Sequence, residues 1–318
     1  MTSATVLQTT VAALEFQNPI VLAAGTAGYG RELAGVVALD QLGGLVTKAV
    51  SREPRHGAPA PRVAEFRGGM LNAVGLANPG LDAVCREHLP WLATHLPRTR
   101  KLMNVVGFST TEFADVVRGV EQAMAPAANA AAVDAFELNV SCPNVKAGGL
   151  EFGADPQALA AVIRGARAET RRPVFVKLSP TLPAIADPAR VAADAGADGI
   201  TVVNTMPGLL IDVERRAPAV GFGTGGMSGP ALLPIGVLAT WRVSRAVSLP
   251  VMGVGGVGSG EDALQYILAG ASLVGMGTAA LRDPASPSRV VRELVRWCER
   301  HGVRAIDELR GTLAWPSA

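Results

Sequence analysis

The sequence predicts a single (β/α)8 barrel domain that spans residues 1–318. Short apolar, β-branched runs alternate with helically patterned segments, as in parallel strands joined by crossover helices. The runs lack a polar face, so both sides of each strand should be buried. Barrels of this kind typically take about 250 residues, so a chain of this length suits one. A doubly wound open sheet is the weaker alternative, because eight regular repeats favour closure.

The expected strands are short and evenly distributed. They cover residues 20–23, 44–48, 101–106, 136–140, 174–178, 199–204, 250–254 and 272–277. Between them, Asp155 and Pro156 have the residue types of an N-cap and a first helical position. Ser259 and Asp262 have capping-box spacing at the start of another helix.

Two connections are much longer than the others, residues 49–80 and 205–230, and both are rich in glycine and proline. Long loops in a compact domain usually form functional lids or interfaces. Both follow strands, so we expect them over the C-terminal face, where barrel enzymes carry their active sites.

Composition excludes several classes of protein. The net charge of +2 and the 4% aromatic content give no electrostatic footprint for nucleic-acid binding. Three well-separated cysteines indicate a reducing compartment rather than a disulfide framework. The sequence shows neither a signal peptide nor an apolar run of about 18 residues, so we expect a cytoplasmic protein without membrane contact. Its four histidines have no spacing that joins them to carboxylates, so no metal site is predicted.

Polar residues and glycines stand where the expected strands end. In order along the chain, these strand-end residues are Gly25, Lys48, Asn104, Asn139, Lys177, Asn204, Gly255–Gly256 and Gly277–Thr278. A lone asparagine or lysine at a strand end is usually a solvated terminus. Several at corresponding positions after apolar runs indicate a common site, because active-site groups of barrels come from the C-terminal ends of different strands.

The glycines belong to "GVGGVGSG" (253–260) and "GMGT" (275–278), which follow the seventh and eighth strands. These positions form the usual phosphate site of barrels, where backbone N–H groups and a short helix N-terminus face the anion. With Lys177 and no metal cluster, this favours flavin mononucleotide (FMN). Lys177 would place positive charge near the flavin N1 edge, which becomes anionic on reduction.

Four asparagines on converging segments would suit a ligand edge that alternates N–H and C=O groups, such as a cyclic imide. They are Asn72, Asn139, Asn144 and Asn204. Lys48 would add charge for a substrate carboxylate. Cys142, in "ELNVSCPNVKAGG" (137–149), lies on the same face and would remove a proton while hydride leaves for the flavin. Cys85 and Cys298 are expected to be inert.

The chain resembles the dihydroorotate dehydrogenases over nearly its whole length. The resemblance is carried in order by "NPIVLAAGTAGYG", "TKAVSREPRHGAPAPRV", "GGMLNAVGLANPG", "ELNVSCPNVKAGG", "VKLSP", "NTMPG", "TGGMSGP", "MGVGGVGSGEDALQYILAGA" and "GMGTA". It implies a flavin enzyme of pyrimidine biosynthesis that converts dihydroorotate to orotate. Cys142 matches the catalytic base of the soluble class 1 enzymes, and Lys48, the second catalytic residue, would contact both flavin and substrate. "NVKAGG" resembles class 1B, whose barrel subunit pairs with an iron–sulfur and FAD subunit and passes electrons to NAD. A homodimer or heterotetramer is expected.

The resemblance also assigns binding residues. Substrate would be bound by Lys48, Asn72, Ala73, Val74, Gly75, Leu76, Asn139, Asn144, Asn204 and Thr205. FMN would be held by Ala24, Gly25, Lys48, Ala49, Asn104, Asn139, Lys177, Val203, Gly229, Gly255, Gly256, Gly277 and Thr278.

Three residues depart from the family pattern. Ala24 replaces a usual serine, Ala58 a usual asparagine and Thr181 a second asparagine. Four alternatives stay open: a dihydropyrimidine dehydrogenase-like flavin enzyme, a fumarate-using class 1A enzyme, a non-flavin phosphosugar barrel and a scaffold protein. The physiological electron acceptor is open as well.

Overall fold

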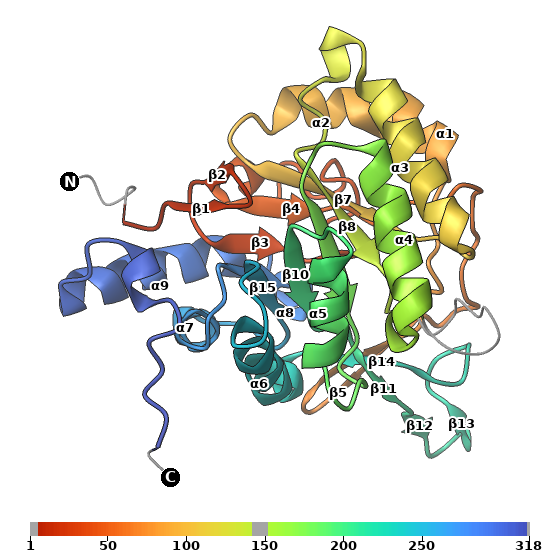
Figure 1. Cartoon of the computed structure of the whole chain (residues 1–318). Coiled ribbons are helices and arrows are strands. Elements are labelled where there is room, and N and C mark those ends of the chain that lie inside the picture. Colours follow the sequence, from red (N-terminus) through yellow and green to blue (C-terminus); the bar gives the residue numbers. More distant parts are fainter. Residues whose placement is uncertain (1–5, 142–151, 317–318) are drawn as a thin grey trace.

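The computed structural model describes residues 6–141 and 152–316, and a closed barrel of parallel strands lies at its centre (Figure 1). The strand order around the barrel is β10-β15-β16-β3-β4-β7-β8-β9. The barrel predicted from the sequence is therefore confirmed, and each expected strand is present. The strands are β3 (Ile20–Leu22), β4 (Gly44–Val46), β7 (Arg100–Val105), β8 (Ala135–Asn139), β9 (Val174–Leu178), β10 (Gly199–Val202), β15 (Val251–Val254) and β16 (Leu273–Met276).

Helices surround the barrel. They are α1 (Leu81–Ala83), α2 (Leu89–His95), α3 (Thr110–Met124), α4 (Pro156–Glu169), α5 (Ala186–Asp194), α6 (Leu233–Ser244), α7 (Gly260–Leu268), α8 (Thr278–Arg282) and α9 (Ser286–His301). A π-helical segment joins α1 to α2 at Val84–His88, and short 3₁₀ turns cover Leu39–Gln41, Ala127–Asn129, Phe152–Ala154, Pro230–Leu232 and Ile306–Leu309. Both predicted helix starts are confirmed, with Asp155 capping α4 and a capping box of Ser259 and Asp262 opening α7. No helix in the described ranges is long and apolar enough to cross a membrane.

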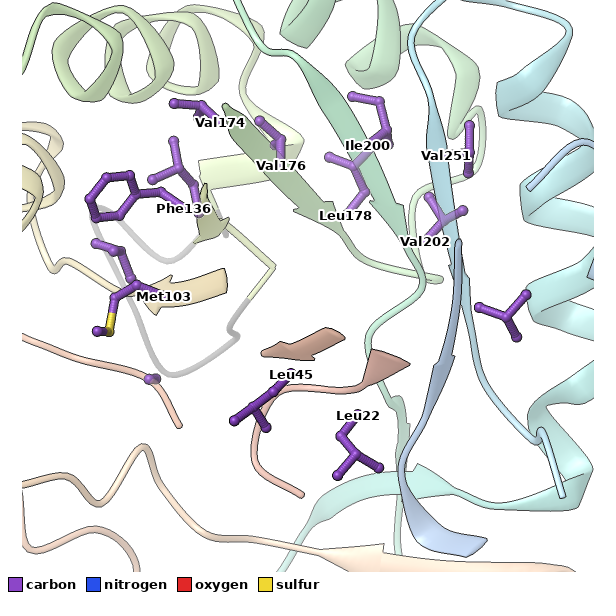
Figure 2. Close-up of a cluster of buried hydrophobic side chains, with 14 of the residues drawn as sticks. Leu22, Leu45, Met103, Phe136, Val174, Val176, Leu178, Ile200, Val202 and Val251 are labelled. Carbon is purple, nitrogen blue, oxygen red and sulfur yellow. The ribbon is translucent and has the colours of Figure 1, made fainter. Parts of the chain in front are cut away.

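Alternate residues of each barrel strand face opposite ways, as the two-residue period of a strand requires. One set packs with helix residues in the main core and includes Leu22, Leu45, Met103, Phe136, Leu178 and Val202 (Figure 2). The other set forms a separate apolar cluster inside the barrel, with Val21, Val46, Leu102, Ala135, Phe175, Met252 and Leu273. Val11 and Phe16 join this inner cluster.

Val11 and Phe16 come from a hairpin of β1 (Thr9–Val11) and β2 (Leu14–Phe16). Figure 1 shows this hairpin at the N-terminal end of the barrel strands. Its two buried side chains pack in the inner cluster and close that end of the barrel.

The two long connections contain a small sheet that the sequence did not predict. Its strand order is β11-β14-β6-β5, and all pairs are antiparallel. The strands are β5 (Val63–Phe66), β6 (Gly69–Asn72), β11 (Met206–Gly208) and β14 (Gly225–Ser228), and a further pair, β12 (Ile211–Asp212) and β13 (Ala217–Pro218), extends outward. The sheet joins residues 49–80 to residues 205–230 and lies at the opposite end from the β1–β2 hairpin (Figure 1).

Candidate active site

Polar side chains lie above the apolar cluster inside the barrel. Leu102, Ala135 and Phe175 belong to that cluster, and two residues further along the same strands come Asn104, Glu137 and Lys177. Strand periodicity gives these residues the same inward direction. Asn139, Lys177 and Thr201 are paired in register across β8, β9 and β10. The polar layer is buried: Asn104, Glu137, Asn139, Lys177 and Thr201 are each at most 8% exposed.

Two lysines bring positive charge to this layer. Lys177 is 6% exposed and Lys48 is half-buried at the end of β4. Among the described residues, neither ammonium group has a carboxylate oxygen within 4.0 Å, whereas Lys101, in the first half of β7, lies 3.5 Å from Asp134. Buried ammonium groups need an opposite charge or strong acceptors. The site is therefore suited to an anionic ligand.

Two of the predicted asparagines are linked through a serine. Asn204 Nδ2 donates to Ser141 Oγ at 2.8 Å, and Ser141 Oγ donates to Asn139 Oδ1 at 3.1 Å. The N–H of Thr205 donates to Asn204 Oδ1 at 2.8 Å. These hydrogen bonds fix the orientation of both amides. Within the described residues, they leave Asn139 Nδ2 available as a donor.

Asn72 ends β6, and its Nδ2 donates to the carbonyl of Gly226 on β14 at 3.0 Å. The following residues, Ala73 to Leu76, pack against the loop at 57–58, since the Ala58 N–H donates to the Val74 carbonyl at 3.0 Å. Gly75 has φ +69°, and a Cβ there would lie 2.5 Å from the Ala58 nitrogen. The predicted substrate segment is thus held by contacts that need glycine at this position.

The predicted phosphate loops lie next to one another. Gly256, after β15, has φ +76°, and a Cβ there would lie 2.6 Å from the Leu233 nitrogen. Thr278, which begins α8 after β16, donates its hydroxyl to Ser228 Oγ at 2.7 Å. Ser228 precedes Gly229, where a Cβ would lie 2.7 Å from the Gly69 Cα. The ends of β14, β15 and β16 therefore form one compact, backbone-rich region.

Backbone donors remain available in this region. Within the described ranges, the N–H groups of Gly256, Gly277 and Thr278 donate no hydrogen bond. The N-terminus of α7 differs, because Asp262 Oδ2 accepts from the N–H groups of Gly258 at 3.0 Å and Ser259 at 2.9 Å. An anion would thus be bound by the glycine loops and the start of α8, since the Asp262 carboxylate occupies the start of α7.

Tyr266 supports the seventh loop from α7. Its hydroxyl donates to the Gly255 carbonyl at 2.7 Å. Burial, with a smaller contribution from Asp262, raises the pKa of Tyr266. The hydroxyl therefore keeps its proton at neutral pH and remains a donor.

The remaining predicted flavin residues lie close to these strand ends. Gly25 has φ +82° with no atom within 4 Å of an added Cβ, so the turn after β3 borders open space at Gly25. Ala24 precedes this glycine. The carbonyl of Ala49 accepts from the Tyr29 hydroxyl at 3.3 Å, next to Lys48. The Val203 N–H donates to the Val254 carbonyl at 3.1 Å, joining the ends of β10 and β15.

Cys142 and Asn144, the predicted base and fourth cage asparagine, lie outside the described residues. The other two cysteines are described and are free thiols. Burial, with a smaller effect of Asp82, raises the pKa of Cys85 to about 11. Burial likewise raises the pKa of Cys298. Both thiols therefore stay protonated at neutral pH, as expected of inert cysteines.

The sequence prediction missed Glu137, Ser141, Thr201 and Ser228, which hydrogen-bond to predicted site residues or to one another. A signal was present for Glu137, because a carboxylate stands in the middle of the apolar run "FELNV". Among the described residues, no group of three or more histidine, cysteine or acidic residues is arranged to hold a metal ion.

Comparison with known proteins gives one consistent family. The family model described as dihydroorotate dehydrogenase matches residues 6–297. The chain is 42% identical over 303 residues to dihydroorotate dehydrogenase B (NAD(+)), catalytic subunit, of Pelobacter propionicus, covering 95% of this chain and 97% of the relative. It is 44% identical over 297 residues to the protein of the same name from Cutibacterium acnes, covering 93% and 94%. It is also 45% identical over 307 residues to the putative dihydroorotate dehydrogenase A (fumarate) of Solibacter usitatus, covering 96% and 98%.

Proposed function

Because the chain belongs to the dihydroorotate dehydrogenase family, we propose that it oxidises dihydroorotate to orotate with FMN as the hydride acceptor. The observation that carries this proposal is the convergence of Lys48, Lys177 and the amide chain at the rim where the phosphate loops of β15 and β16 also end. Oxidising a CH–CH bond to C=C removes one hydride and one proton, so the site needs a hydride acceptor and a base.

The residues fit a flavin mononucleotide. Asn104 Oδ1 is buried and has no hydrogen-bond partner in the described part of the chain, so this acceptor needs a donor from a ligand. The N–H groups of Gly256, Gly277 and Thr278 suit a phosphate. Lys177 supplies a positive charge for a ring that gains negative charge on reduction. The family is flavin-dependent in general, and these groups support the mononucleotide.

Substrate binding follows from the rest of the layer. Lys48 would bind the substrate carboxylate. Asn139 Nδ2 and the pre-positioned Asn72 and Asn204 would hydrogen-bond the alternating N–H and C=O groups of the ring. Fixing the ring in this way aligns its two reacting carbons, which lowers the entropic part of the barrier.

Cys142 is proposed as the base. Its thiolate Sγ would take the proton from one substrate carbon while the neighbouring carbon loses hydride to the bound FMN, leaving the C=C bond of orotate. A free thiol titrates near pH ~8.5, and positive charge from Lys48 would favour the thiolate.

The electron acceptor separates two candidates. The relatives from Pelobacter propionicus and Cutibacterium acnes are named as catalytic subunits, so we propose that this chain works with a second subunit that carries electrons to NAD. The fumarate-using alternative is supported by the name of the Solibacter usitatus relative. A subunit contact is further supported by exposed apolar side chains on the insertion between β10 and β14, namely Leu209, Ile211, Val213 and Phe222.

An absorption spectrum of the purified protein tests the function. We expect a flavin spectrum that bleaches when dihydroorotate is added without oxygen. The isolated chain should then reduce artificial acceptors but very little NAD. Efficient fumarate turnover would move it to the class 1A type, and a colourless protein that takes up no FMN would refute the proposal.

A further inference from the structure

Glu137 is a buried carboxylate in the middle of a barrel strand. It is 1% exposed and lies on β8 between Ala135 and Asn139. No lysine or arginine nitrogen lies within 4.0 Å of it in the described residues. Removing an unpaired charge from water is costly, and an apolar side chain would fill the same space without that cost. Packing alone therefore does not explain a glutamate here.

Its two oxygens have separate partners. Asn104 Nδ2 donates to Glu137 Oε1 at 2.7 Å, and the Thr201 hydroxyl donates to Glu137 Oε2 at 2.9 Å. These residues come from β7 and β10, the strands one and two places away from β8 on either side. The Asn104 backbone N–H is also fixed, since it donates to Thr47 Oγ1 at 3.1 Å.

The chemistry of Glu137 determines the orientation of the Asn104 amide. An ionised carboxylate only accepts hydrogen bonds, so the amide must turn its NH₂ group toward Glu137. Its oxygen then faces the other way. That Oδ1 atom is buried and has no partner within the described residues. A buried carbonyl without a donor is unfavourable, so Asn104 holds an acceptor in place for a ligand N–H.

We propose that Glu137 is a positioning residue that orients Asn104 so that Asn104 Oδ1 accepts a hydrogen bond from the ring N–H of the flavin. This inference rests on the proposed function, which supplies the flavin. The oxidised isoalloxazine ring has a single ring N–H, at N3, between two carbonyls. An acceptor fixed at Asn104 is complementary to that group, whereas a freely rotating amide would also present its NH₂ group. The negative charge of Glu137 also disfavours the anionic reduced ring and so opposes Lys177.

The test compares binding of FMN and of N3-methyl-FMN, which lacks the N–H, to the apoprotein by quenching of flavin fluorescence. Wild type should prefer FMN. Glu137→Leu should lose about tenfold or more in FMN affinity and most of the preference, as expected for a lost hydrogen bond to a buried group. In an Asn104→Leu background the same Glu137→Leu change should have little further effect, because Glu137 acts through Asn104.

Glu137→Gln keeps the shape and can still accept from Asn104 Nδ2 while donating to Thr201. It should retain FMN affinity and the preference for FMN, yet raise the midpoint potential of the bound flavin because a negative charge is lost. This variant also serves if Glu137→Leu does not fold. Phe136→Leu is the matched control on the same strand, because Phe136 packs in the main core. It should reduce stability without changing the ratio of the two affinities.

Two results would overturn the inference. One is an unchanged preference in Glu137→Leu. The other is a loss of FMN affinity from Glu137→Leu that is as large in the Asn104→Leu background as in the wild-type background. If wild type binds FMN and oxidises dihydroorotate in either case, the proposed function stands and only the role of Glu137 fails. A wild type that binds no flavin refutes both.

Discussion

The rim of the barrel has two chemically different halves. From β7 to β10 the strands end in long polar side chains, Asn104, Asn139, Lys177 and Asn204. Glu137 accepts a hydrogen bond from Asn104, and Ser141 links Asn139 to Asn204. From β15 to β16 the strands end in glycines, and backbone N–H groups take the place of side chains. The strand ends thus present polar side chains with fixed donors and acceptors on one half and backbone N–H donors on the other.

This difference matches two parts of one ligand. A ring with fixed N–H and C=O positions is recognised by oriented amides, each of which has a defined donor and acceptor. A phosphate is recognised by any close set of N–H groups, and glycines let the backbone approach it closely. We therefore expect the side-chain half to recognise the rings of the ligands and the glycine half to bind the cofactor phosphate. Each prediction below tests that division.

The largest expected effect concerns the proposed base, which follows β8 in the sequence. Cys142→Ala should bind FMN and orotate but reduce its flavin at least ~100-fold more slowly, the usual range for a lost general base. Cys142→Ser should retain a trace of activity that rises with pH, because a hydroxyl is the poorer base. Anaerobic stopped-flow measurement of flavin reduction gives the rate. A rate in Cys142→Ala equal to wild type would remove the cysteine from the mechanism.

The next effect is on the glycine half. Gly256→Ala places a Cβ 2.6 Å from the Leu233 nitrogen at φ +76°, so the loop must move and FMN affinity should fall by about tenfold or more. Gly302→Ala is the matched control. It has a similar φ of +67° but nothing within 4 Å, at the C-cap of α9. Equal FMN affinity in Gly256→Ala and wild type, measured by fluorescence quenching, would show that this loop does not bind the phosphate.

The two halves also differ in how far the sequence predicts them. The glycine loops and the strand-end lysines could be predicted from local patterns, because each stands at the end of a run of apolar residues. Glu137 and Ser141 have roles that depend on residues of other strands, such as Thr201 and Asn204. Which strand neighbours which, and which side chains face inward, is set by closure of the barrel and not by local composition.

The small sheet above the rim shows the same limit. β6 pairs with β14, and Asn72 lies opposite Gly226. Each strand is four residues long, too short for a periodic signal. The sheet is stable because two long connections, far apart in sequence, meet over the barrel. Sequence reasoning predicted both connections and their face but not the pairing inside them.

A smaller effect separates substrate binding from cofactor binding and concerns Asn72, on the small sheet. Asn72→Ala should weaken orotate binding by about 1–3 kcal/mol, because a buried ligand group loses its partner. FMN affinity should stay unchanged, since Asn72 lies on β6 of the small sheet rather than on a barrel strand. Asn129→Ala is the control. Asn129 lies beyond the end of α3, and its Nδ2 donates to the carbonyl of Ala123 in that helix. The orotate affinity of each variant is measured by adding orotate and following the flavin absorbance. Unchanged orotate affinity in Asn72→Ala would exclude this amide from the cage.

The smallest effect concerns the start of α7. This segment directly follows the glycine loop of β15 in the sequence, but its N–H groups already have a partner. The Asp262 carboxylate already accepts from Gly258 and Ser259 there, and a negative charge repels a phosphate. Ser259→Ala should therefore lower the free energy of unfolding by about 1 kcal/mol through loss of the cap and leave FMN affinity unchanged. Urea unfolding of the apoprotein gives the first quantity and flavin titration the second. A fall in FMN affinity larger than the stability loss would mean that α7 binds the phosphate, and the glycine half would then extend beyond Gly256 and Thr278.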